Sequence, residues 1–439
     1  MKALFLKGSS SLFKRLLALS LLSLSAFALA TDDVWGEEDW GDDDWGDAWS
    51  EEARSPWQPV SGFIELGAGG RLQTDAAGLD RATLGEARGR VETGYVSERW
   101  RADLRTDVRY DDVVEGWQLD VRELTLSFAA GPVDFKLGRQ VLTWGTGDFL
   151  FLNDLFPKDW QAFFSGLDDE YLKAPTNAIK ASYFGEKASL DLVWIPRFES
   201  DNYLNGERFS FFNPAVGGPV APGFSLDEPS DDALAARLFG NLGSVEWALY
   251  GYWGYTGQPE AADSQGQPRF SRLNTYGASA LLPLGPGLFN LEAALHDQQS
   301  AGGELAFTPA DKVMLLVGYQ QELIANLTLG LQYQFEDLQD YSRWLAGQPY
   351  PEFAAGSERH LMTLRLDQRL WQDKLTLSLF AFYSPTDDDF YLRPKVSYRL
   401  DDQWEFSGGF NLMGGEEDHT FFGQLADNSN AWLRLRSRY

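Results

Sequence analysis

The sequence contains no cysteine in its 439 residues. This absence excludes a disulfide framework and a lipid-modified cysteine, so stability must come from hydrogen bonding and packing. Beyond the first 30 residues there is also no uninterrupted apolar stretch of the ~20 residues that a membrane-spanning helix needs. Only three histidines are present, His296, His360 and His419, and none lies in the local context of a catalytic serine or cysteine dyad. We therefore expect no enzyme, no cofactor and no resident metal.

Basic residues are scarce relative to acidic ones. The chain has 37 Lys and Arg against 65 Asp and Glu, a formal net charge of −28 that argues against nucleic acid as a partner. Aromatic residues and glycine are abundant, with 16 Trp, 17 Tyr, 30 Phe and 43 Gly, although the mean hydropathy is only −0.31. This combination fits a membrane β-barrel, because a barrel places its apolar side chains at every second position.

The N-terminus has the parts of a secretory signal. Cations precede an apolar run over 16–29, and a short Ala-Leu-Ala sequence ends at Ala30. This order predicts cleavage after Ala30; the alternative, a membrane anchor, is disfavoured because the run contains three serines and is too short to span a bilayer. The predicted parts are a signal peptide over 1–30, an acidic leader over 31–57 and a barrel over 58–439.

Apolar and charged side chains alternate from Arg99 to Asp111. One row contains Trp100, Ala102, Leu104, Thr106, Val108 and Tyr110, and the other contains Arg99, Arg101, Asp103, Arg105, Asp107, Arg109 and Asp111. A period of two puts these rows on opposite faces of a strand. The charged row needs water or counter-charges, which a polar lumen supplies and a sandwich core does not. We therefore expect the charged row to line a pore.

Similar alternation divides the whole chain into about eighteen strands. We expect them near 60–73, 84–96, 99–111, 117–129, 133–145, 176–184, 187–197, 233–241, 244–255, 272–282, 288–297, 312–321, 326–336, 359–370, 374–384, 389–400, 403–413 and 430–439. Their connections alternate between short and long, as periplasmic turns and outer loops do. The predicted fold is all-β, a transmembrane antiparallel up-and-down β-barrel in the cell outer membrane, in contact with its lipid and lipopolysaccharide. Boundary errors of a few residues leave sixteen strands as an alternative.

The last strand carries a further signal. Its apolar row ends in the aromatic Tyr439, which resembles the C-terminal signal of outer-membrane barrels and implies the barrel-assembly machinery as a partner. Its other row and those of nearby strands carry excess cations. These predicted pore-lining cations are Arg365, Arg393, Lys395, Arg399, Arg434 and Arg436. Such an arc favours an anionic solute or polymer, although facing carboxylates such as Glu86 and Glu92 dilute that preference.

The acidic leader contains a five-residue repeat that begins at Trp35, Trp40 and Trp45 and ends at Trp49. Self-repulsion and the absence of an aliphatic core predict disorder in isolation, as in a solvated tether. Regular tryptophans expose apolar surface unless they dock, which leaves two other hypotheses. The leader either folds up as a plug against the cationic lumen wall, or binds a periplasmic or inner-membrane exporter partner.

The segment from Gly138 to Gly145, G-R-Q-V-L-T-W-G, is followed by Asp148 and by N-D-L-F-P over 153–157. It resembles the "GRQ…WG…D" stretch of a family of poorly characterised proteobacterial outer-membrane β-barrels, distantly similar to alginate-export-type barrels and porins. The resemblance implies a channel, in some members beside an inner-membrane exporter, without naming its cargo. The alternative is a non-conducting structural or adaptor barrel that works with such a transport partner.

The motif opens a long loop with many aromatic and aliphatic residues. Arg139 is predicted to line the pore and to clamp the infolded loop through Asp148 or Asp154; the alternative is an ordinary lumen arginine. The loop is too apolar to float in water, so it should pack inward or against another loop. Its acidic cluster over 168–170 either binds Ca²⁺ or bridges lipopolysaccharide, or is a solvated loop tip.

Overall fold

The computed structural model describes residues 55–299 and 305–439. The predicted signal peptide and the leader tryptophans Trp35, Trp40, Trp45 and Trp49 lie outside the described residues. The plug, tether and adaptor hypotheses for the leader therefore stay predictions.

Eighteen long strands form one sheet. They are β1 (Ser61–Arg71), β2 (Ala82–Val96), β3 (Trp100–Asp111), β4 (Gly116–Ala130), β5 (Val133–Val141), β6 (Pro175–Phe184), β7 (Ser189–Ile195), β10 (Ala233–Leu242), β11 (Val245–Tyr255), β14 (Arg272–Leu284), β15 (Gly287–Gln299), β17 (Lys312–Ile324), β18 (Leu327–Leu338), β19 (Glu358–Leu370), β20 (Leu375–Ser384), β21 (Asp389–Arg399), β22 (Trp404–Gly415) and β23 (Asn430–Arg438).

Short elements occupy the connections. They are α2 (Trp160–Ser165), η1 (Asp169–Leu172), β8 (Phe211–Asn213), β9 (Gly218–Val220), β12 (Ala261–Asp263), β13 (Pro268–Arg269), β16 (Leu305–Phe307), α3 (Tyr341–Ala346), η2 (Pro351–Phe353) and η3 (Gly423–Asn428). None of the helices in the described part of the chain is long and apolar enough to cross a membrane.

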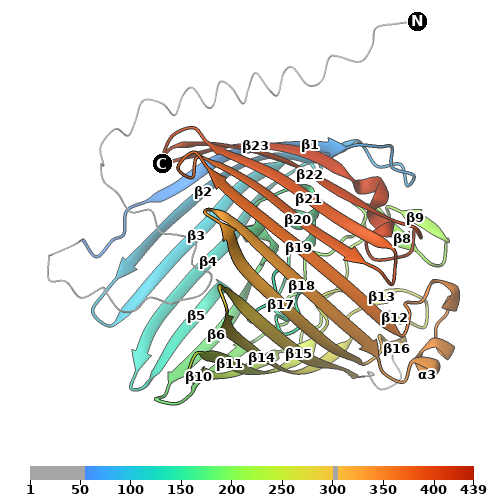
Figure 1. Cartoon of the computed structure of the whole chain (residues 1–439), viewed down its shortest axis with the longest axis horizontal. Coiled ribbons are helices and arrows are strands. Elements are labelled where there is room, and N and C mark those ends of the chain that lie inside the picture. The colour runs from blue at the N-terminus through green and yellow to red at the C-terminus, as the bar shows by residue number, and fades with distance from the viewer. Residues whose placement is uncertain (1–54, 300–304) are drawn as a thin grey trace, which may run out of the picture. The chain divides into compact units, whose positions relative to one another are not determined.

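The sheet closes on itself. Each long strand pairs antiparallel with its neighbours in chain order, and β23 pairs with β1, with Leu435 opposite Leu66. Figure 1 shows this seam, where β23 lies beside β1. Closure removes the sheet edge, so backbone groups of the first and last strands find partners inside the barrel. The prediction of an eighteen-strand antiparallel barrel is confirmed, and the sixteen-strand alternative is wrong.

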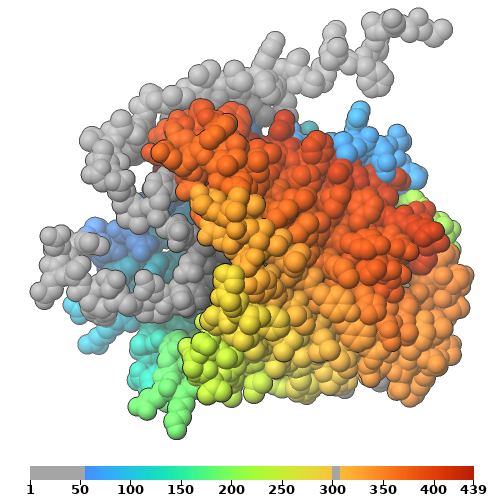
Figure 2. Space-filling view, in the orientation of Figure 1, coloured from blue at the N-terminus to red at the C-terminus, as the bar shows by residue number. Residues whose placement is uncertain are grey.

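The outer surface is apolar where it would meet lipid. Exposed apolar side chains recur at alternate positions along the wall, and the strands coloured yellow to red form one continuous outer surface in Figure 2. Examples are Leu66, Val91, Val108, Leu124, Ile179, Leu192, Leu249, Leu291, Leu315, Leu331, Leu377, Val396, Phe406 and Leu433. Side chains of the other row, such as Glu65, Arg88 and Asp107, are buried inside.

Aromatic rings mark both ends of this apolar band. Tyr95 stacks on Trp100 with ring centroids 5.0 Å apart, beside the short turn between β2 and β3. Tyr110 and Trp117, with centroids 5.3 Å apart, lie at the opposite end of the wall. Two aromatic girdles at the lipid interfaces are typical of outer-membrane barrels.

The connections alternate in length as predicted. Those at one end are tight turns, such as 131–132, 243–244 and 285–286, whereas those at the other end include 142–174 and 196–232. Several strand boundaries differ from the prediction by one to three residues, and one differs by four. The expected strand over 133–145 ends at Val141, because the four residues after it leave the wall and turn into the barrel.

Prediction on the wall. Leu315→Arg on β17 should destabilise the barrel by about 2–4 kcal/mol, the cost of a cation facing lipid near the midplane. Leu315 is 43 % exposed and faces outward. Gln320→Arg on the inward row of the same strand is the matched control and should change stability little. Denaturant titration of both variants in liposomes measures the difference; equal losses would contradict the assigned faces.

Candidate functional site

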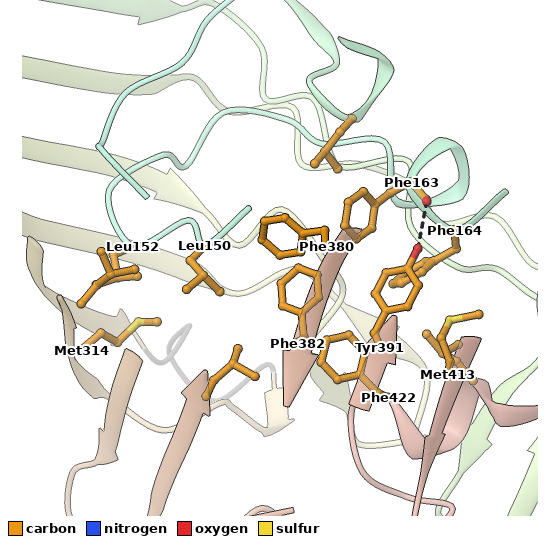
Figure 3. Packing of buried hydrophobic residues seen from close by; sticks show 14 of the residues in the cluster. Leu150, Leu152, Phe163, Phe164, Met314, Phe380, Phe382, Tyr391, Met413 and Phe422 are labelled. Atoms are coloured by element: carbon orange, nitrogen blue, oxygen red, sulfur yellow. Dashed lines mark hydrogen bonds between the residues drawn. The ribbon is translucent and has the colours of Figure 1, made fainter. Parts of the chain in front are cut away.

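The connection from β5 to β6, residues 142–174, folds into the barrel, and we name it the constriction loop. Phe163 and Phe164, on its helix α2, pack against Phe380, Phe382 and Tyr391 of the inner wall, as Figure 3 shows. The Tyr391 hydroxyl donates to the Phe163 carbonyl oxygen at 3.3 Å. The expectation that this apolar loop packs inward is confirmed.

A buried carboxylate on β15 fixes the start of the loop. Glu292 is 1 % exposed and accepts hydrogen bonds from the backbone N–H of Gly147, at 2.7 Å, and of Thr146. Asn153 Nδ2 donates to its other oxygen at 2.8 Å. Gly145 has φ +86° and would bring a Cβ to 3.1 Å from Glu292, so the tight approach requires glycine. Neighbouring His296 bonds the Leu152 carbonyl at 2.9 Å and is structural.

The strand that enters the loop is distorted at the motif. Gly138 has φ +116°, and a Cβ there would lie 2.2 Å from the Leu124 carbonyl oxygen. Gln140, 1 % exposed, donates to the Ala178 carbonyl. Arg139 bonds the Val121 carbonyl at 2.8 Å and Glu199 at 2.8 Å.

The predicted clamp through Arg139 is therefore wrong. Asp148 pairs with Arg365 at 2.9 Å, and Asp154 pairs with Lys158 at 3.0 Å. Arg139 stands opposite Leu124 in the register and is engaged by Glu199 of the next long connection and by the Val121 carbonyl. Asp148 ties the loop to β19 through Arg365, whereas Asp154 pairs with Lys158 within the loop.

The acidic cluster over 168–170 lies inside the barrel, so the solvated-tip interpretation is wrong. Asp169 pairs with Arg393 at 2.6 Å, and Asp168 lies 3.4 Å from Arg436 and 3.5 Å from Arg434. Burial alone would raise the pKa of Asp168, but Lys395, Arg434 and Arg436 outweigh it and lower this pKa well below its usual range. The constriction loop thus pairs with Arg393, Arg434 and Arg436 of the cationic arc.

A second set of charges ties the far end of the loop to β2 and β3. The Tyr171 hydroxyl donates to Asp107 at 2.8 Å and accepts from Arg90 at 2.7 Å. Arg88 lies 3.9 Å over the Tyr171 ring and pairs with Asp107 at 2.7 Å. Arg90 also pairs with Glu170 at 2.8 Å. Because these groups are buried together, each compensates the desolvation of the next.

The connection over 196–232 adds a second infolded segment. Arg208 on it donates to the Thr83 carbonyl and pairs with Asp111. Asp201 accepts from the Lys158 N–H at 2.9 Å and from Trp160 Nε1 at 2.7 Å, which joins this segment to the constriction loop. Burial raises the pKa of Asp201 to about 6, against the opposing effects of Lys158 and these hydrogen bonds.

Between the constriction loop and the wall formed by β2, β3 and β4 lies a cavity of about 630 Å³, which we name the lumen cavity. Its charged lining residues are Arg88, Arg109, Arg122, Arg139, Arg208, Glu86, Asp111, Asp120, Asp159 and Glu207. Arg109 binds Asp120 at 2.7 Å, and Asp159 caps helix α2 by accepting from the Ala162 N–H at 2.8 Å. Most of these charges are therefore held by one another or by the loop.

Arg122 is the exception among the lining arginines. It donates to the carbonyls of Glu170 and Lys173, both at 2.9 Å, and lies 4.7 Å over the Tyr171 ring. Within residues 55–299 and 305–439 no carboxylate forms an ion pair with it, and its buried Nε has no hydrogen-bond partner. This guanidinium is the group of the site best placed to receive an anion.

The predicted pore-lining residues occupy three settings. Arg101, Arg105, Asp107 and Arg109 lie on the inward row of β3, where Asp103 pairs with Arg101 at 2.9 Å and Arg105 with Glu92 at 3.1 Å. Arg99 lies in the turn before β3, and Arg139 at the kink of β5. The others lie on the inward rows of β19, β21 and β23: Arg365, Arg393, Lys395, Arg399, Arg434 and Arg436.

Four residues of the site were not predicted from the sequence: Arg88, Arg90, Arg122 and Glu292. The first two stand two apart in a row with Glu86 and could have been found by the alternation used for β3. Arg122 is an extra residue in its strand: Arg105 pairs with Glu123, and Thr106 pairs with Val121. Its signal was the shift of apolar positions in β4 from odd to even numbers, which marks a β-bulge.

No protein-family model and no curated protein matches the chain in sequence. Solved structures do match. OccAB3 of Acinetobacter baumannii gives a TM-score of 0.53 at 9 % identity, covering 87 % of this chain and 98 % of its own. OccAB1 of the same organism gives 0.52 at 9 % identity, covering 88 % and 97 %. The anion-selective porin from Comamonas acidovorans aligns over 87 % of this chain and 100 % of its own at 11 % identity, with a TM-score of 0.43.

These similarities establish the fold. A closed eighteen-strand wall with an apolar outer band, aromatic girdles and a loop folded into the lumen defines the class of outer-membrane β-barrels with a porin-type fold. This chain is such a barrel, and it lies in the outer membrane. The narrower resemblance to alginate-export-type barrels stays a prediction.

Prediction on the loop anchor. Glu292→Ala should loosen the start of the constriction loop, because two buried N–H groups lose their acceptor at a cost of about 1–3 kcal/mol each. Hydrogen exchange over 145–153 should accelerate while exchange of the barrel strands stays slow. Glu246→Ala, on an exposed carboxylate of β11, is the control. Unchanged exchange over 145–153 would mean that Glu292 does not anchor the loop.

Prediction on pH. The pKa of Asp201 is higher in the folded loop, about 6, than the ordinary 3.8, so its ionisation opposes the folded contact. Loop stability should therefore fall as the pH rises from about 4 to about 6. Exchange protection over 198–205, corrected for intrinsic rates, should be greater at acidic than at neutral pH. Asp201→Asn should abolish this dependence and Asp112→Asn should not; a protection that rises with pH would refute the assignment.

Proposed function

We propose that this barrel is a porin-like channel that passes small organic anions through the lumen cavity. One observation carries the proposal: the buried guanidinium of Arg122 lines that cavity and forms no ion pair with a carboxylate in the described part of the chain. Arginine presents several N–H donors in one plane and suits carboxylate groups. The proposal includes no catalytic step.

The arginine arc on β21 and β23 gives less support than its charge suggests. Arg393, Arg434 and Arg436 are held by Asp168, Asp169 and Glu65, so their charges are compensated within the protein. Selectivity for anions therefore depends on the opposite side of the lumen, where the constriction loop leaves space. The compensated arc holds the loop in place.

Passage requires binding that is favourable but weak. Carboxylates in the lumen cavity already accept from arginines, as Glu86 and Asp120 do from Arg109, and so have less capacity to attract a cation. An anion that enters can bond Arg122 and then exchange to neighbouring guanidinium groups. Several weak sites in sequence allow a solute to enter and leave.

A polymer cargo, an export direction and a periplasmic partner are further proposals. The cavity volume of about 630 Å³ suits a small solute better than a folded polymer. The acidic leader is the part of the chain with the composition of a partner-binding segment, and deletion of 32–52 followed by a conductance measurement tests whether it acts as a plug.

Prediction on selectivity. The reversal potential of the reconstituted barrel in a KCl gradient should indicate preference for chloride. Arg122→Gln should lower the anion-to-cation permeability ratio by up to about fivefold, because two unit charges 4 Å apart in water interact by about 1 kcal/mol. Arg343→Gln, on an exposed outer helix, is the control and should leave the ratio unchanged. Cation preference in the unmodified barrel would overturn the proposal.

A further inference from the structure

The barrel wall is incomplete between β4 and β5. The strand β4 pairs with β3 from Gly116 to Phe128, almost its full length, but with β5 only from Leu124 to Ala130. Its half toward the long loops, residues 116–123, thus has no ladder partner on the β5 side. An open strand edge inside a lipid-facing wall is unusual, since backbone groups there must be satisfied by other means.

Two distortions produce this opening at the same level. On β4, the bulged residue Arg122 interrupts the register just above Leu124. On β5, Gly138 adopts φ +116° just below Arg139, the last residue paired with β4. A bulge bends its strand, and a left-handed glycine changes the direction of the other, so the two strands diverge from there.

The lumen cavity reaches this opening. It touches five successive residues of β4, from Gln118 to Arg122, and also Arg139 and Pro175 on the strands across the gap. A void confined to the inside of a barrel would meet every second residue, because side chains alternate between faces. Contact with an unbroken run places the cavity at the free edge of the strand.

The opening lies at the height of the lipid. Trp117, 73 % exposed, belongs to the aromatic girdle at the end with the long loops. Leu119 and Leu124, 67 % and 57 % exposed, follow on the outer face toward the midplane. The unpaired edge therefore begins at the interface and continues into the hydrocarbon layer of the outer half of the membrane.

One side chain spans the gap. Arg139 Nε donates to the Val121 carbonyl at 2.8 Å, and its terminal nitrogen pairs with Glu199 at 2.8 Å on the connection after β7. A long flexible side chain can move aside without breaking a ladder of backbone hydrogen bonds. The side chain of Arg139 therefore closes the gap between β4 and β5 at this level.

We propose that the unpaired half of β4, beside the end of β5, forms a lateral route between the lumen cavity and the membrane for an anion with one alkyl chain. The charged head bonds Arg122 inside, and the chain leaves past Leu119, Val121 and Leu124. The head matches a guanidinium that forms no ion pair with a carboxylate in the described part of the chain, and the alkyl chain matches the apolar outer flank. This deepens the proposed function, on which it rests, by naming an amphiphilic substrate class.

The first test uses a diazirine-labelled decanoate with full-length barrel in proteoliposomes. Labelling should be enriched in the peptides that contain 116–124 relative to Leu291, an outward residue on β15 whose strand pairs on both sides. Excess decanoate should compete and excess decanol should not, because the alcohol lacks the charge for Arg122. Each further buried methylene should strengthen competition about fourfold from hexanoate to decanoate. Equal labelling of both regions would overturn the proposal. Transfer of the label between two barrels would also overturn it, because a second copy of the barrel would then occupy the edge.

The second test closes the route. Val121→Trp fills the gap beside the carbonyl that Arg139 bonds, and it should abolish labelling of Tyr171 in the cavity. Val121→Phe fills the gap in part and should reduce this labelling. Labelling of Tyr171 that persists with the gap closed would show entry from water and overturn the lateral route.

The two proposals fail separately. Chloride preference that depends on Arg122, together with equal labelling of β4 and β15, would retain the anion channel and remove the lateral route. If the barrel prefers cations but excess decanoate still reduces labelling at β4, the anion-channel proposal fails and binding of the amphiphile is retained. Arg122→Lys keeps the charge and should preserve part of both readouts.

Discussion

A chain that crosses lipid with strands must satisfy its backbone N–H and C=O groups within the protein. Closure of the sheet through β23 and β1 meets this requirement and also dictates the side-chain pattern, since each strand then has one face toward lipid and one toward the lumen. Apolar Leu433 and buried Arg434 on β23 illustrate the result. The fold, the apolar band and the charged interior follow from this requirement.

The charged interior in turn demands compensation, and the constriction loop provides it. The loop is apolar toward β20 and β21, where Phe163 meets Phe382, and acidic toward β23, where Asp168 meets Arg436. Two unlike faces fix its position across the lumen more firmly than either would alone. The space that remains lies against β2, β3 and β4, so the position of the lumen cavity is a consequence of how the loop is held.

Alternation made the strands predictable, because a period of two is imposed locally by the pleat. The inward packing of the loop was also predictable, since its aromatic residues cannot remain in water. The ion-pair partners were not predictable. Arg139 and Asp148 are nine residues apart, but Arg139 pairs with Glu199 on a distant loop and Asp148 pairs with Arg365 on a distant strand. Glu292 anchors a segment 146 residues earlier, and no local pattern carries that information.

The bulge at Arg122 affects both the barrel wall and the lumen cavity. Beyond this bulge, the outer half of β4 has no hydrogen-bond ladder with β5. The loss of these backbone hydrogen bonds is unfavourable in a wall that faces lipid. The same bulge brings a guanidinium into the cavity and under the constriction loop, where it bonds Glu170 and Lys173. A wall built only for stability would keep the ladder and place this arginine elsewhere. The position of the defect, beside the cavity and at the height of the lipid, therefore favours a function for the edge itself.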